Sequence, residues 1–141
     1  MDALAPDLDL GRALAGAAHQ GTACIPGALD ERFRRSLRQE IDAGPSRSMT
    51  GSLGITPHTE GKWYRRLVAV VTVYGWARFA ITRDRQGSVV REWRPGLGDL
   101  VLMRGPGLAG ARDGRPFHLA EGPTRGERCS LGVRMAVGGP P

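Results

Sequence analysis

The sequence predicts one mostly β domain with one or two helices packed outside it near the N-terminus. Its 141 residues are enough to close a single core but too few for a second one. The 21 glycines and 10 prolines favour turns over long helices. We therefore expect a single domain over 1–141, with a helical part at 1–44, a β part at 45–137 and a short tail at 138–141.

Two helical patterns occupy the N-terminal part, at residues 8–18 and 28–41. In the second pattern, apolar residues recur every four positions: Leu29, Phe33, Leu37 and Ile41. Residues four apart share one side of a helix, so this side is apolar while arginines and acids lie elsewhere. We expect the second helix to lie against the outside of the β part.

After Pro45 the chain changes to short apolar or alternating runs separated by glycine, proline and aspartate, which is typical of antiparallel strands. The expected strands are 53–59, 66–74, 78–82, 89–93, 99–103, 116–120 and 128–135. Residues 84–87 and 95–98 read as tight turns, and 105–114 as a loop. Strands of this number with a helix outside predict a sandwich or barrel, among them the double-sheet jelly roll.

Charge and cysteine content restrict the expected partners and location. The net charge is +6, but the arginines are scattered from Arg12 to Arg134 and form no binding motif, so no nucleic acid is expected. Cys24 and Cys129 have no pair spacing, which argues against a disulfide framework and fits a cytoplasmic protein. No apolar run approaches the roughly 20 residues of a membrane helix, so no membrane partner is expected.

Three residues in the β part predict a metal site. His58 and Glu60 are two residues apart, and on an extended strand such residues point to the same face. His118 lies on a later strand, so two imidazoles and one carboxylate converge if the two strands are neighbours. That set is the ligand set of non-haem iron(II) oxygenases. The alternative for either histidine alone is a turn or a hydrogen-bonded core residue.

The last strand adds a cation and a hydroxyl. Arg128 and Ser130 share one face of this strand with Gly132 and Arg134. A buried guanidinium requires a carboxylate partner, because leaving it unpaired is unfavourable. The alternative is that Arg128 is a surface residue on an edge strand.

In order and spacing, these motifs resemble the 2-oxoglutarate and iron(II)-dependent dioxygenases with a double-stranded β-helix. The matching motifs are His58-Thr59-Glu60, a His-x-Glu variant of the iron motif, the distal His118, and Arg128-Cys129-Ser130. Residues 98–103 and 116–118 also resemble the segments around the family's distal histidine. The resemblance covers about residues 53–135.

The resemblance implies a double-stranded β-helix, that is, a jelly roll or cupin-like barrel. It implies that His58, Glu60 and His118 hold Fe(II), and that Arg128 and Ser130 bind the distal carboxylate of 2-oxoglutarate. The implied activity is that of an oxidoreductase which uses molecular oxygen, decarboxylates 2-oxoglutarate to succinate, and hydroxylates or otherwise oxidises a small-molecule substrate.

Two other functions stay open at this point. One is a cupin-type metalloprotein that does not use 2-oxoglutarate, and the other is a non-catalytic ligand-binding barrel. The chain is short for the resembling family, so the pocket is open, a partner subunit completes it in a homodimer, or turnover has been lost. Arg104, Arg115 and Arg134 are expected at the surface, with a substrate carboxylate as the alternative partner of each.

Overall fold

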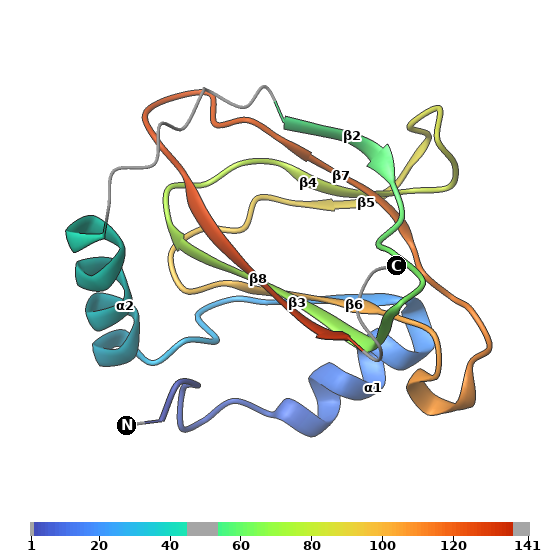
Figure 1. Cartoon of the computed structure of the whole chain (residues 1–141), viewed down its shortest axis with the longest axis horizontal. Helices are drawn as coiled ribbons and strands as arrows, with labels where there is room; N and C mark the ends of the chain where they lie inside the picture. Colours follow the sequence, from blue (N-terminus) through green and yellow to red (C-terminus); the bar gives the residue numbers. More distant parts are fainter. Residues whose placement is uncertain (1, 45–53, 137–141) are drawn as a thin grey trace.

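Two four-stranded antiparallel sheets face each other in the computed structural model, which describes residues 2–44 and 54–136 (Figure 1). One sheet has the strand order β1-β6-β3-β8 and the other has the order β2-β7-β4-β5. The elements are α1 (Leu10–Gln20), β1 (Thr22–Ile25), α2 (Glu31–Ala43), β2 (Gly54–His58), β3 (Tyr64–Tyr74), β4 (Phe79–Thr82), β5 (Val89–Trp93), β6 (Leu100–Arg104), the 3-10 turn η1 (Leu108–Gly110), β7 (Phe117–Glu121) and β8 (Cys129–Ala136). The prediction of a mostly β chain with two N-terminal helices is confirmed.

Both predicted helices form, and an aspartate cap sets where each begins. The carboxylate of Asp9 accepts a hydrogen bond from the backbone N–H of Arg12 at 2.9 Å, so α1 begins at Leu10. Asp30 accepts from two backbone N–H groups and starts α2 in the same way. The predicted helices began two to three residues too early because the prediction did not use these caps.

Helix α1 covers the outer face of the first sheet, whereas α2 is mostly exposed. Ala13 and Ala17 of α1 are buried, but no residue of α2 is. On α2, Arg35 pairs with Glu31, and other basic residues of this helix are likewise at its surface. Arg32, Arg35 and Arg38 therefore lie on a solvated part of this helix. The helix touches β3, where the Arg38 guanidinium lies 4.1 Å from the centroid of the Tyr74 ring.

Alternation along β6 divides the apolar residues between two clusters. Leu100 and Leu102 belong to the cluster that includes α1, on the outer face of the sheet. Val101 and Met103 point the other way and pack with Phe79 of the opposite sheet. Val101, Met103 and Phe79 therefore fill part of the space between the two sheets with apolar side chains.

The seven predicted strands all form, each within about two residues of the expected bounds, and one further strand was missed. This is β1, whose Thr22 pairs with Met103 of β6. Four residues between Gly21 and Pro26 carry too little periodicity to indicate a strand. Residue 53 and the predicted tail at 138–141 lie outside the described residues. No helix in the described ranges is long and apolar enough to cross a membrane.

Candidate metal centre

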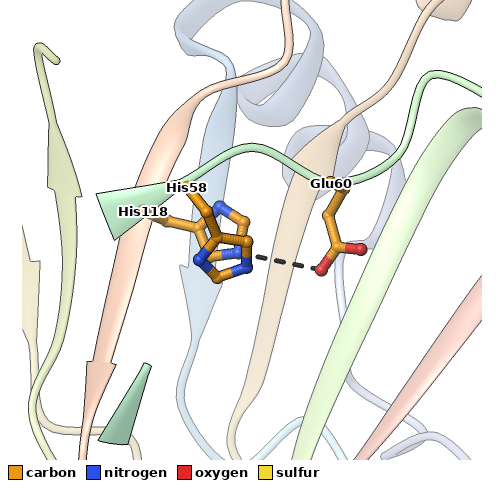
Figure 2. Close-up of side chains that lie close together, drawn as sticks. All are labelled: His58, Glu60 and His118. Atoms are coloured by element: carbon orange, nitrogen blue, oxygen red, sulfur yellow. Dashed lines mark ion pairs between the residues drawn. The ribbon is translucent and has the colours of Figure 1, made fainter. Parts of the chain in front are cut away.

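The pairing of β2 with β7 brings the two predicted histidine ligands together. His58 and His118 are direct partners in this antiparallel register, although they are sixty residues apart in the sequence. Their ring centroids are 4.3 Å apart, with an angle of 53° between the ring planes. Figure 2 shows the two rings side by side, with the Glu60 carboxylate facing them.

Glu60 follows the end of β2 by two residues and completes the cluster. Its Oε1 lies 3.7 Å from Nε2 of His118, and one ligand atom from each of the three residues lies within 4.8 Å of the others. Two atoms bound to one metal ion at about 2.1 Å are at most about 4.2 Å apart. Ligands that share one face of an ion are closer still, about 3 Å apart, so side-chain rotations that shorten these separations by at most about 2 Å would let all three share one ion.

Backbone carbonyls fix which ring nitrogen of each histidine is free. Nδ1 of His58 lies 2.8 Å from the carbonyl oxygen of Thr56, and Nδ1 of His118 lies 3.3 Å from that of Pro116. A carbonyl only accepts hydrogen bonds, so in both rings Nδ1 carries a proton and Nε2 is the nitrogen left for a metal. Metal-binding histidines are usually oriented in this way by their second nitrogen.

Two arginines hold Glu60 in place. Arg134 on β8 donates from Nε and Nη2 to the two carboxylate oxygens, at 2.9 and 3.0 Å. Arg115 donates from Nη1 to the backbone carbonyl of Glu60 at 2.7 Å. Arg115 is itself fixed by Asp113, which accepts from its Nε and Nη2 at 2.9 and 2.8 Å. Both the side chain and the backbone of Glu60 are therefore positioned by charge-assisted hydrogen bonds.

The same neighbours keep the Glu60 carboxylate ionised. The adjacent His118 imidazole and the Arg134 guanidinium lower the pKa of Glu60 from 4.5 to about 2, although partial burial acts in the opposite direction. At neutral pH this residue therefore presents an anionic oxygen, which suits a metal ligand.

The sequence did not assign this role to Arg134, which was expected at the surface or on a substrate. The signal was present, because Arg134 shares the face of β8 that carries Arg128 and Ser130. Gly132 makes the contact with Glu60 sterically feasible: a Cβ at this position would lie 2.3 Å from Nη1 of Arg134. Arg104 has a structural role, since it donates to the carbonyls of Gly114 and Ala18.

The cluster opens into a cavity of about 260 Å³ between the two sheets. One wall comes from β2, β4 and β7, and the opposite wall from β3, β6 and β8. Besides the three candidate ligands, the lining includes Ile55, Val70, Phe79, Met103, Ala120, Arg128, Ser130, Gly132 and Arg134. The structure thus brings every predicted site residue to one cavity.

Arg128 is a half-buried cation in this cavity wall. Its Nε is buried and has no hydrogen-bond partner within residues 2–44 and 54–136. Burial lowers the pKa of Arg128, but a guanidinium remains protonated in proteins. A charged donor in such a place requires an anion.

The ligand types suit a divalent transition metal. Two neutral imidazoles and one carboxylate bind iron(II) while leaving coordination positions free, as in the facial triad of non-haem iron enzymes. No protein-family model, curated protein or solved structure matches this chain. Its function is therefore inferred from the residues of this cavity.

Proposed function

We propose that this chain is a non-haem iron(II) and 2-oxoglutarate-dependent oxygenase that oxidises a small organic substrate. The proposal rests on the side chains that line one cavity. The candidate ligands His58, Glu60 and His118 lie within 4.8 Å of one another. The Arg128 guanidinium, whose buried Nε has no hydrogen-bond partner among the described residues, lines the same space. A metal and a dicarboxylate together satisfy all of these groups.

The path of the chain supports a double-stranded β-helix, or jelly roll, as the fold of this oxygenase. Successive strands alternate between the two sheets: β2 is in one, β3 in the other, β4 and β5 in the first again, β6 in the second, β7 in the first and β8 in the second. Repeated crossing between two antiparallel sheets is typical of jelly rolls. The candidate site lies between the sheets, where such barrels hold ligands.

The residues have separate roles in this proposal. Arg128 pairs with the distal carboxylate of 2-oxoglutarate in a charge-assisted contact, and the Ser130 hydroxyl donates to the same group. His58 and His118 keep their protons on Nδ1 and offer Nε2, while Arg134 keeps Glu60 ionised. Bound iron(II) supplies the oxidation, in which 2-oxoglutarate, oxygen and a C–H bond give succinate, carbon dioxide and a C–OH group.

The apolar side chains of the cavity restrict water around the reacting groups. Phe79 is 3% exposed and its ring stacks on the His118 imidazole, with centroids 5.6 Å apart and an angle of 20° between planes. Met103 is 1% exposed and lies in the same lining. These apolar side chains weaken the screening by solvent around the two imidazoles.

Succinate formation from 2-oxoglutarate tests the proposal. The protein is incubated in air with iron(II) and 2-oxoglutarate, and succinate is measured for wild type, His118→Ala and Arg128→Ala. The matched controls are His19→Ala and Arg125→Ala, which remove the same side chains from exposed positions outside the cavity. We expect metal-dependent succinate from wild type and both controls, and none above background from the two site variants.

Two results would contradict the proposal. Wild type that forms no more succinate with iron(II) than with a chelator is not an oxygenase of this class. Metal-dependent oxidation that survives Arg128→Ala unchanged points instead to a cupin-type metalloprotein, in which 2-oxoglutarate has no part.

A further inference from the structure

A second pocket, of about 430 Å³, is open to solvent. The first of its lining residues, Lys62, follows the candidate ligand Glu60 by two positions in the sequence. One wall is the segment that enters β3, and the other is the segment that follows β6. Two backbone hydrogen bonds join these walls: the N–H of Arg66 donates to the carbonyl of Pro106 at 2.9 Å, and that of Gly105 to the carbonyl of Arg66 at 2.7 Å. The lining residues are Lys62, Trp63, Arg65, Arg66, Pro106 and Gly107.

The pocket concentrates positive charge. Three of its six lining residues are cations, namely Lys62, Arg65 and Arg66, and none is acidic. Some cations outside the pocket are neutralised by acidic neighbours, as Arg78 is by Glu92 and Glu121. Within the described part of the chain, none of the three pocket cations forms an ion pair with a carboxylate. Such a group is attractive to an anion that carries more than one negative charge.

The backbone of one of these cations, Arg66, has an unusual conformation. Arg66 has a φ of 63°, in the left-handed region, and lies at an irregularity in the pairing of β3 with β8 between Tyr64 and Val68. For a residue with a side chain this conformation costs roughly 1–2 kcal/mol. Strain of this kind is often found where a bulge directs side chains toward a ligand.

The second arginine lies against Gly107, where the backbone conformation favours glycine. Gly107 has a φ of 89°, and a Cβ there would lie 3.4 Å from Nη2 of Arg65. The guanidinium therefore lies against bare backbone. Trp63 adds an apolar wall, because its indole packs so closely on Gly61 that a Cβ there would lie 2.5 Å from the ring.

We propose that this pocket is a binding site for the phosphate group of a small organic phosphate. Two guanidinium forks and an ammonium match the tetrahedral oxygens and the double charge of a phosphate ester, which a single carboxylate does not need. Trp63 and Pro106 offer apolar surface to the organic part of the ligand. The site does not depend on the proposed oxidation, because no residue of the metal cluster lines it.

The test measures binding of phenyl phosphate to the full chain by NMR, without added iron or 2-oxoglutarate. Shifts of the Trp63 indole N–H signal, assigned with Trp63→Phe, report occupancy of the pocket. The variant Arg65→Gln/Arg66→Gln removes two cations, and Arg83→Gln/Arg85→Gln makes the same charge change on the exposed β4–β5 turn. Benzoate serves as the matched carboxylate probe.

We expect saturable binding of phenyl phosphate that weakens at least tenfold in the pocket variant and stays within twofold in the turn variant. Benzoate should bind at least fivefold more weakly than phenyl phosphate, and added salt should weaken both. Equal losses in the two double variants would mean that only net charge acts, and would overturn the proposal. Benzoate binding as tight as phenyl phosphate would overturn the assignment to phosphate.

Discussion

Replacing Arg128 by methionine separates a ligand-binding arginine from a structural one. Methionine keeps much of the apolar stem and removes the guanidinium, whose Nε is buried without a hydrogen-bond partner in the described residues. If Arg128 serves a bound dicarboxylate, the variant loses affinity for that ligand while the ligand-free protein becomes more stable. A structural arginine predicts the opposite sign for stability.

The expected changes in stability and in ligand affinity both follow from the burial and hydrogen bonding of the Arg128 guanidinium. An unsatisfied buried polar group costs about 1–3 kcal/mol, so its removal should stabilise the ligand-free protein by about 1 kcal/mol or more. For a chain of this size that is a rise in Tm of about 3 °C. Hydrogen bonds between charged groups contribute about 1.5–3 kcal/mol, so affinity for 2-oxoglutarate should fall by about 10- to 150-fold.

Both quantities are measured on the same two proteins. Thermal unfolding without ligand gives the change in stability, and anaerobic calorimetry with iron(II) and 2-oxoglutarate gives the change in affinity. Arg125→Met, at an exposed position three residues earlier, controls for loss of charge. A variant that is less stable by more than about 1 kcal/mol and binds 2-oxoglutarate normally would refute the reasoning.

Three further predictions concern the surroundings of the ligands. Arg134→Ala should weaken iron(II) affinity by about 10- to 100-fold, measured by anaerobic titration, because Glu60 loses the two bonds that orient it. Phe79→Ala should lower the free energy of unfolding by about 3–5 kcal/mol in urea titrations, since this 3% exposed ring fills the space between the sheets. In metal-free protein, the ion pairs of Glu60 should stabilise the fold above pH 4.5 and be lost as pH falls toward its folded-state pKa of about 2. Relative to Glu60→Gln, wild type should lose at most about 3 kcal/mol over this range in unfolding experiments.

Each of these predictions has a result that would contradict it. Unchanged metal affinity in Arg134→Ala would mean that Glu60 needs no support or is no ligand. A loss below about 1 kcal/mol in Phe79→Ala would mean that the sheets do not pack as described. Parallel stability curves for wild type and Glu60→Gln between pH 5 and 2 would show that Glu60 has no favourable partners.

Local patterns were sufficient to predict the strands and the three candidate ligands. Short apolar runs between turn residues indicated the strands, and the close spacing of His58 and Glu60 kept the two side chains near each other, although Glu60 lies beyond the end of β2. The aspartates Asp9 and Asp30 could also have been used, because capping needs only nearby residues. By contrast β1 depends on β6, eighty residues away in the sequence, and its four residues alone do not specify a strand.

The supports of the site were harder to predict, because they depend on which strands become neighbours. Arg134 contacts the Glu60 carboxylate only because β8 lies opposite β2 across the cavity. Arg115 donates to the Glu60 carbonyl from the loop that precedes β7. The basic pocket likewise needs the backbone contact between Arg66 and Pro106. The closeness of Lys62, Arg65 and Arg66 in the sequence indicates a local concentration of positive charge. It does not indicate that Pro106 and Gly107 face these residues across a pocket.

Anaerobic titration of iron(II) tests the shared metal site most directly. We predict one ion bound per wild-type chain, and loss of that binding in His58→Ala, Glu60→Ala and His118→Ala, each of which should remain folded. His19→Ala should bind as wild type does. Retention of the same stoichiometry and affinity in all three ligand variants would contradict the account, because the ion would then be held somewhere else.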